Sequence, residues 1–218
     1  MEIKIIHSPF EHIIIYNFFE EKELNDITVE LETIFEFLLK SKKIKKLNLS
    51  ANNRGNILTE RIAFDVSEFS KNKKNIILKH FEKLFNPVIT AILFKDNNFS
   101  NFLRCVNDTG VVVGVYRDGD YYEPHYDSGV ITAVSHIWHR DFIYEGGELF
   151  FPDYNNYTIV PKYNDLIIFP SYLSHGVRKI KNLVNHESLL FNRISLTLLT
   201  GSVQGELANK NLKIKYDN

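Results

Sequence analysis

The hydrophobic positions of the chain follow two different periods, one in each half of the sequence. Residues 2–19 hold two short apolar runs rich in isoleucine and aromatic residues, EIKII and HIIIYNFF, and such runs predict strands. Residues 20–40 instead repeat an apolar residue every three or four positions, and acidic residues crowd the start of the segment. This is the pattern of an amphipathic helix whose dipole favours acids at its beginning. Its predicted buried side is made by Leu24, Ile27, Leu31, Ile34 or Phe35, and Leu38.

A second helix is predicted in NKKNIILKHFEKLF, where Ile77, Phe81 and Leu84 or Phe85 share a side. Asn86 and Pro87 should end it, and a further short helix should run through 89–94. Before this helix, residues 48–58 are polar and turn-prone and predict a loop. The N-terminal half is therefore expected to contain strands and at least two helices.

From Leu103 onward the period changes to that of short strands separated by turn residues, and no helical period is present. The runs are LRCVN, VVVGVYR, YYEPHYD, GVITAVSHIW, GELFF, YTIV, DLIIF, HGVRKI and RISLTLL. Such a series predicts an antiparallel barrel or jelly roll. The chain is thus an α+β protein that is mainly β. We expect N-terminal strands and supporting helices at 1–102, a barrel core at 103–201 and a peripheral tail at 202–218, together forming one compact domain.

Composition and charge narrow the function classes. The 218 residues include 26 basic and 27 acidic side chains, and a net charge of −1 gives no global attraction to nucleic acid or to an anionic membrane. The single cysteine, Cys105, excludes an internal disulfide and favours a reducing compartment. The sequence shows no signal-peptide pattern and no apolar run long enough to cross a membrane. We therefore expect a cytoplasmic protein.

The segment YRDGDYYEPHYD, residues 116–127, contains the first candidate for chemistry. His125 and Asp127 are two residues apart in a run that predicts a strand, so both side chains should point to the same face. An imidazole and a carboxylate on one face suit two ligands of one metal ion. The candidate third ligand is His175 in SYLSHGVRKI, because two histidines and one carboxylate form the facial triad of non-haem Fe(II) oxygenases.

A rival pair has the same spacing. His139 and Asp141 in IWHRDF also form His-x-Asp, but they follow a predicted strand and precede the acidic, glycine-rich IYEGGE turn. They lack the turn-then-strand lead-in that precedes His125. We therefore favour His125 and Asp127 as the metal-binding pair.

Several segments together resemble the prolyl 4-hydroxylase-like 2-oxoglutarate/Fe(II) dioxygenases. They are, in order, YRDGDYYEPHYD (116–127), EGGELFF (145–151), PKYNDLIIFP (161–170), SHGV (174–177) and RISLTLL (193–199). The resemblance covers roughly residues 103–201. The resemblance implies a double-stranded β-helix (jelly-roll) core with N-terminal helices supporting one sheet. It also implies Fe(II) held by His125, Asp127 and His175, 2-oxoglutarate as cosubstrate, O2, and ascorbate as a reductant.

The resemblance also assigns cosubstrate-binding residues. Arg193 matches the family's basic residue on the last strand, and a guanidinium can make two parallel hydrogen bonds to a carboxylate. Ser195 should share its face. Tyr116 heads the metal motif and is expected to line the pocket. His136 stands where many relatives have a tyrosine. The connection between His175 and Arg193 is longer than in most relatives, which leaves Arg178 and Lys179 as alternative cations.

The expected activity is hydroxylation of an unactivated C–H bond with release of succinate and CO2. The substrate is expected to be a peptide, a protein or a small molecule, with a prolyl residue ranked first. Asp127 as a ligand favours hydroxylation over halogenation, in which a halide takes the carboxylate's place. Residues 50–62, with Arg54 and Arg61, and residues 181–190 are candidate lids. The alternatives are a catalytically inactive or metal-structural β-barrel binding module and a cupin-like metal isomerase.

Overall fold

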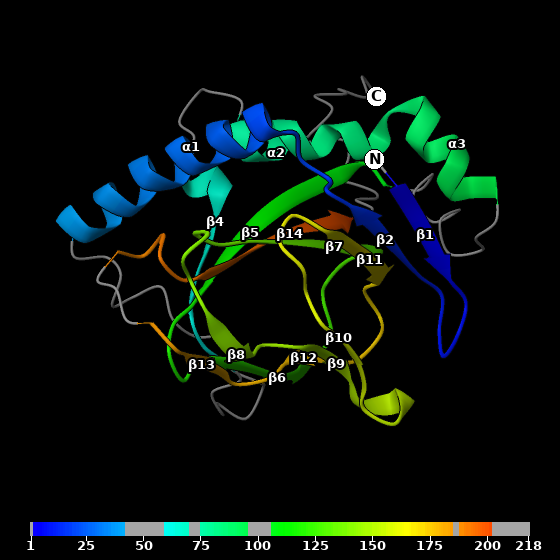
Figure 1. Ribbon diagram of the computed structural model, residues 1–218. Helices are drawn as coiled ribbons and strands as arrows, with labels where there is room; N and C mark the ends of the chain where they lie inside the picture. The colour runs from blue at the N-terminus through cyan, green and yellow to red at the C-terminus, as the bar shows by residue number, and fades with distance from the viewer. Residues whose placement is uncertain (1, 42–58, 70–74, 96–105, 185–187, 202–218) are drawn as a thin grey trace, which may run out of the picture.

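The computed structural model describes residues 2–41, 59–69, 75–95, 106–184 and 188–201. Two antiparallel sheets are stacked face to face, and the helices cover the outer face of the larger one (Figure 1). The larger sheet has seven strands, in the order β1 (Glu2–Ile6), β2 (His12–Tyr16), β11 (Leu166–Pro170), β7 (Ile131–Ile137), β14 (Arg193–Gly201), β5 (Asp108–Tyr116) and β4 (Ile62–Asp65).

The smaller sheet forms the opposite wall of the barrel. Its five strands are, in order, β10 (Tyr157–Ile159), β9 (Leu149–Phe151), β12 (His175–Val177), β6 (Tyr121–His125) and β3 (Thr59–Glu60). Strands β13 (Ile180–Asn182) and β8 (Tyr144–Gly146) form a separate two-stranded sheet. Two facing antiparallel sheets with strands alternating between them make the double-stranded β-helix that was expected, in an α+β chain that is mainly β.

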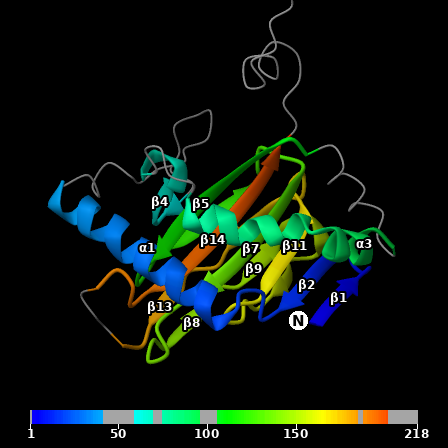
Figure 2. The ribbon, with the colours of Figure 1, turned by 90° about the horizontal axis from the view of Figure 1, so that it is seen from above.

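The helices form one layer across the larger sheet (Figure 2). They are α1 (Glu21–Lys40), α2 (Ile76–Phe81) with the 3-10 turn η3 (Glu82–Phe85), and α3 (Pro87–Lys95); shorter 3-10 turns are η2 (Val66–Phe69) and η5 (Pro152–Tyr154). The helix expected over 20–40 is confirmed: Glu20 and Glu23 form a capping box at its start. Asn75 caps α2 by accepting from the Leu78 N–H, and the helical segment ends before Pro87 as expected.

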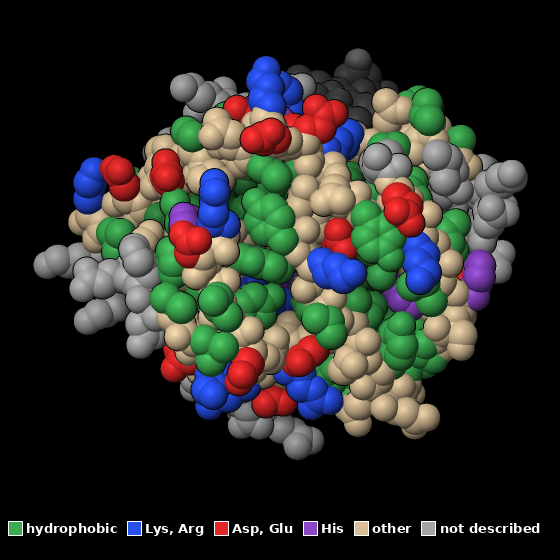
Figure 3. Space-filling model, viewed as in Figure 1, with side chains coloured by type: hydrophobic (Ala, Val, Ile, Leu, Met, Phe, Trp, Pro, Cys, Tyr) green, Lys and Arg blue, Asp and Glu red, His purple; other side chains and the backbone are tan. Residues whose placement is uncertain are grey.

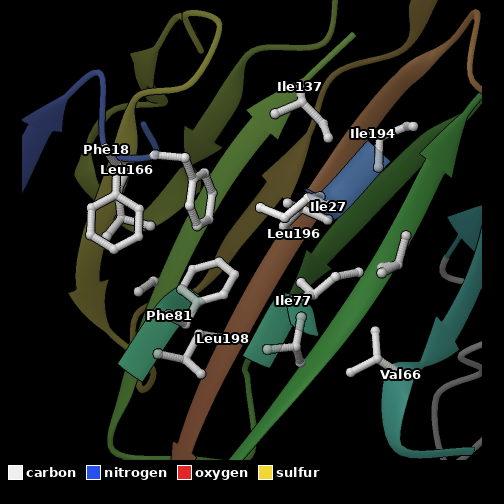
Figure 4. Close-up of a cluster of buried hydrophobic side chains, with 14 of the residues drawn as sticks. Phe18, Ile27, Val66, Ile77, Phe81, Ile137, Leu166, Ile194, Leu196 and Leu198 are labelled. Carbon is white, nitrogen blue, oxygen red and sulfur yellow. The ribbon is translucent and has the colours of Figure 1, made fainter. Parts of the chain in front are cut away.

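The main hydrophobic core lies between the helices and the larger sheet. Alternate residues of β14 (Ile194, Leu196 and Leu198) point toward the helices and pack with Ile77 and Phe81 (Figure 4). The residues that alternate with them (Arg193, Ser195 and Thr197) therefore point the other way, into the space between the sheets. One strand thus supplies both the core and the interior of the barrel.

The barrel extends further along the chain than the expected division at residue 102. Strands β1, β2 and β4 belong to the larger sheet and β3 belongs to the smaller one, so segments on both sides of 102 pair within each sheet. The run LRCVN was expected to be a strand; residues 106 and 107 are not, and β5 begins at Asp108. Residues 103–105, with Cys105, lie outside the described residues, as do the loop expected at 48–58 with Arg54, and the tail at 202–218. The last part of the candidate lid, 59–62, consists of β3, Arg61 and the start of β4 rather than a loop.

Two turns need backbone conformations that most residues avoid. Gly146 and Gly147 have φ of 76° and 74°, and a Cβ on Gly146 would lie 2.1 Å from the Lys179 carbonyl oxygen. Asn164 has φ of 63°. Its side-chain oxygen accepts from the Phe19 N–H at 2.9 Å, and its side-chain nitrogen donates to the Phe19 carbonyl at 2.8 Å. This turn therefore fastens the segment before α1 to the barrel.

The surface seen in Figure 3 carries Lys and Arg side chains interspersed with Asp and Glu side chains, in keeping with a net charge near zero. Within the described residues, none of the helices combines the length and the apolar content that crossing a membrane requires.

The packing predicts that Phe81→Ala destabilises the protein strongly. The Phe81 side chain is fully buried, and its ring centroid lies 5.2 Å from that of Phe19. Its removal should cost about 3–5 kcal/mol of unfolding free energy, measured by denaturant titration. Val88→Ala is the control, because Val88 is 69% exposed and should change stability by less than about 0.5 kcal/mol. Equal effects of the two substitutions would contradict this description of the core.

Candidate active site

A cluster of metal-ligating side chains lies where β6 and β12 pair. His125 is the last residue of β6, His175 is the first residue of β12, and the two stand opposite each other in the register. Asp127 follows two residues after His125. One ligand atom from each of the three side chains lies within 4.8 Å of the others. In the part of the chain that the structure describes, this is the one group of three or more such residues close enough to hold a metal ion.

Each histidine is oriented by its own backbone neighbourhood. The Nδ1 of His125 lies 2.9 Å from the Glu123 carbonyl oxygen, and the Nδ1 of His175 lies 2.9 Å from the Leu173 carbonyl oxygen. Because a carbonyl oxygen only accepts, Nδ1 carries the proton in both rings and Nε2 keeps its lone pair. The two Nε2 atoms lie 3.5 Å and 3.3 Å from the Asp127 carboxylate. The free lone pairs therefore converge on the position that a metal ion would take.

Asp127 lies beyond the strand on which it was expected. β6 ends at His125, so strand alternation does not explain why the two side chains face the same space. Instead the Asp127 N–H donates to the Ser171 carbonyl oxygen at 3.2 Å, and Thr132 Oγ1 donates to Asp127 Oδ2 at 2.6 Å. The Ser171 hydroxyl lies 2.9 Å from Thr132 Oγ1 and completes the chain of contacts. Asp127 is thus positioned by a turn that hydrogen bonds with Ser171 and Thr132 hold in place, and not by the expected continuation of strand β6.

The electrostatics favour the protonation states that a metal requires. Burial alone would raise the pKa of Asp127, but its close contacts with the His125 and His175 rings and the hydrogen bond from Thr132 hold it far below its usual range. Burial lowers the pKa of His125, and this outweighs the opposing effect of Asp127. An ionised carboxylate beside a neutral imidazole is the combination that binds a divalent cation.

The cluster opens into a cavity of about 530 Å³ between the two sheets. Besides the three candidate ligands, its walls include the predicted cosubstrate residues Tyr116, His136 and Ser195. His136 is buried, and burial together with the charge of Arg193 holds its pKa well below the ordinary value, so the ring is neutral. Its Nδ1 has no hydrogen-bond partner among the described residues. The Ser195 hydroxyl donates to the Gly114 carbonyl at 3.4 Å.

Arg193 lies behind Tyr116 and is fully buried. Its Cζ is 5.0 Å from the centroid of the Tyr116 ring. None of its three side-chain nitrogens makes a hydrogen bond of ordinary geometry within the described residues, and no carboxylate there forms an ion pair with it. Burial lowers the pKa of Arg193. A buried cation without an anion is costly, so the site fits an anionic group that the chain itself does not supply.

The alternative residues point elsewhere. Arg178 and Lys179 are exposed, and the Arg178 guanidinium lies 4.3 Å from the Phe150 ring centroid on the outer side of the barrel. His139 and Asp141 have side chains that are 49% and 71% exposed, and no third ligand joins them among the described residues. Thr132 was not predicted from the sequence as part of the site. Its signal would have been the alternation of Thr132, Val134 and His136 on one face of a strand.

Comparison with known proteins agrees with this geometry. The model of the 2OG-Fe(II) oxygenase superfamily matches residues 111–199. No curated protein matches the chain. Among solved structures, a prolyl-4-hydroxylase from Pseudomonas putida is similar, with 13% identity, a TM-score of 0.56, and coverage of 88% of this chain and 93% of that one.

Two further structures share the fold. A prolyl hydroxylase from Trichoplax adhaerens, in complex with a hypoxia inducible factor peptide fragment, has 14% identity and a TM-score of 0.59, and the match covers 94% of this chain and 87% of that one. The viral collagen prolyl hydroxylase of Paramecium Bursaria Chlorella virus-1, in a 2OG complex, has 15% identity and a TM-score of 0.51, with 88% and 96% covered. The family match thus covers the segment that carries His125, Asp127 and His175, and the chain shares its fold with these prolyl hydroxylases.

Proposed function

We propose that this protein is a hydroxylase in which His125, Asp127 and His175 hold Fe(II) and Arg193 binds the distal carboxylate of 2-oxoglutarate. One observation carries the proposal: a triad with free Nε2 lone pairs and a fully buried, unpaired guanidinium belong to the same barrel interior. A binding module whose metal is structural has no use for open coordination positions or for an uncompensated cation. This combination therefore favours the enzyme over the inactive alternative.

Bound Fe(II), with 2-oxoglutarate and O2, would supply the oxidising power for hydroxylation, with succinate and CO2 as by-products. The chain's own residues bind and orient. Thr132 fixes the Asp127 carboxylate, and the backbone carbonyls of Glu123 and Leu173 fix the two imidazoles. Arg193, with His136 and Ser195 near it on the interior face, sets the direction in which the cosubstrate lies. The barrel walls limit the water that reaches the reacting centre.

The proposed substrate is a prolyl residue, in a peptide or as the free amino acid. The similar folds of two prolyl hydroxylases, one of them solved with a peptide, support this choice. Identity of 13–14% to both leaves the specificity to the cavity walls of this chain. Mass spectrometry of a peptide library after turnover, searching for the gain of one oxygen, tests the choice directly. A library in which no peptide gains an oxygen would count against a peptidyl substrate.

Asp127→Ala should abolish the iron centre. Without oxygen, the native protein with Fe(II) and 2-oxoglutarate should show a weak visible charge-transfer band, and with oxygen it should form succinate slowly even without substrate. The variant should lose the band, and its succinate formation should fall by more than about 100-fold, because a direct ligand matters more than its supporting residues. Asp141→Ala, in the rival pair, is the matched control and should behave as the native protein. An unchanged band in Asp127→Ala would refute the ligand assignment.

Thr132→Val tests whether the hydroxyl positions the metal ligand. Valine keeps the shape of threonine but removes the hydrogen bond to Asp127 Oδ2. Metal affinity, measured by titration with Mn(II) or Fe(II), should fall by about 10–100-fold while the fold is kept. Thr33→Val is the control, because Thr33 lies on the exposed side of α1 and bonds only a helix carbonyl. Equal metal affinities in both variants would show that the Thr132 hydroxyl does not act on the site.

Arg193→Met should separate cosubstrate binding from stability. Loss of the guanidinium should weaken 2-oxoglutarate binding by about 2–5 kcal/mol, as for other buried charge pairs that lose one partner. The unliganded protein should be as stable as the native one or more stable, since an unpaired buried charge is replaced by an apolar side chain. Calorimetry and denaturant titration measure the two quantities, and Arg178→Met is the surface control. A variant that unfolds readily but binds 2-oxoglutarate normally would give Arg193 a structural role instead.

A further inference from the structure

A second arginine reaches the cavity from the N-terminal part of the chain. Arg61 stands between β3 and β4, its side chain lines the cavity, and the residue is 9% exposed. It enters over Gly114 on the neighbouring strand β5: a Cβ at that position would lie 2.5 Å from Arg61 Nη1. The absence of a side chain at Gly114 is therefore what allows the guanidinium to lie against the sheet and face the interior.

The contacts of Arg61 are with neutral groups. Its Nη1 donates to the Tyr116 hydroxyl at 3.1 Å, and its Cζ lies 4.4 Å from the centroid of the Tyr122 ring. The Tyr122 ring in turn stacks on the imidazole of His125, with a centroid distance of 3.6 Å and an angle of 14°. Arg61 is thus joined through one aromatic ring to a candidate iron ligand.

Arg61 has no acidic partner in the part of the chain that is described. Asp65 and Glu68 also line the cavity, but neither forms an ion pair with it, and its buried Nε has no hydrogen-bond partner there. A tyrosine hydroxyl and aromatic faces compensate a guanidinium only in part for its lost hydration. The guanidinium is therefore placed to receive an anion from outside the chain, and a carboxylate suits its two parallel N–H groups.

The two buried arginines occupy different parts of the interior. Both lie near the Tyr116 ring, with Cζ distances of 5.4 Å for Arg61 and 5.0 Å for Arg193. Arg193 is fully buried and does not itself line the cavity, whereas Arg61 does, beside the N-terminal wall residues Thr59, Ala63 and Phe64. One guanidinium is enough for the distal carboxylate of 2-oxoglutarate. Arg61 is then left for a second anion, bound in the cavity next to Tyr122 and His125.

We propose that Arg61 is a specificity-determining residue that binds a carboxylate of the oxidised substrate. This rests on the proposed function, because it assumes that 2-oxoglutarate occupies the Arg193 side. The substrate class is therefore a molecule whose free carboxylate lies close to the C–H bond that reacts, such as a free amino acid or the C-terminal residue of a peptide. A residue inside a peptide presents a neutral amide at that position and would leave the guanidinium unpaired, which is a strong basis for discrimination.

The test compares ligands that differ only in charge. A panel of N-acetyl-amino acids, including N-acetyl-L-proline, is paired with the corresponding amides, and binding to the Mn(II)·2-oxoglutarate protein is measured by calorimetry. The native protein should bind at least one acid about tenfold or more tightly than its amide, because a desolvated charged hydrogen bond contributes about 1.5–3 kcal/mol. Arg61→Gln should remove this difference, and Arg61→Lys should restore part of it. Arg178→Gln, on the outer surface, should keep it in full.

The affinity for 2-oxoglutarate is measured in parallel and separates the possible failures. It should change less than about twofold in Arg61→Gln, since Arg193 is the cosubstrate's anchor. If Arg61→Gln instead weakens 2-oxoglutarate binding and leaves the preference for acids over amides unchanged, Arg61 serves the cosubstrate and the proposal is overturned. Equal binding of every acid and its amide by the native protein, including no binding of either, also overturns it while leaving the proposed function intact. A native protein that binds no 2-oxoglutarate would refute the proposed function itself.

Discussion

The alternation of side chains along β14 is the constraint on which both the core and the site depend. This strand pairs with β5 on one side and with β7 on the other over most of its length, so its register is fixed from both edges. Ile194, Leu196 and Leu198 then face the helices, while Arg193 and Ser195 face the space between the sheets. A slip of one residue would place a guanidinium in the hydrophobic core. The burial of apolar surface that stabilises the fold therefore also fixes the direction of the proposed cosubstrate anchor.

The metal cluster depends on a different kind of constraint, because its carboxylate comes from a turn. β6 and β12 set His125 against His175 through their pairing, but Asp127 has left the strand. Its position is fixed by the Ser171 backbone and by the Thr132 hydroxyl, which come from the larger sheet and the connection that follows it. The carboxylate is thus held from the larger sheet while the imidazoles belong to the smaller one. The site exists only when the two sheets are stacked, which couples metal binding to the complete fold.

A structural feature could be predicted from the sequence where the residues that determine it are close together in the chain. The helix at 21–40 and most of the barrel strands rest on neighbouring residues, and these expectations are confirmed. The order of motifs placed His125, Asp127 and His175 correctly as neighbours. The strands β3 and β4 were missed, because Thr59–Glu60 is too short to show a period and β4 gains its stability from pairing with β5. Thr132 and Arg61 were not assigned to the site because the contacts that define their surroundings are distant in sequence.

The two arginines near the Tyr116 ring show why ligands explain this interior better than stability does. Each guanidinium has lost most of its hydration, neither has a carboxylate partner among the described residues, and their charges repel each other. An interior chosen for stability alone would place apolar side chains at both positions. Anions that bind the folded chain and not the unfolded one offset this cost in proportion to their concentration and affinity. If the two proposed carboxylates bind there, the folded state with its cavity empty is the least stable form of the site, and each carboxylate would neutralise one arginine and stabilise the stacking of the two sheets.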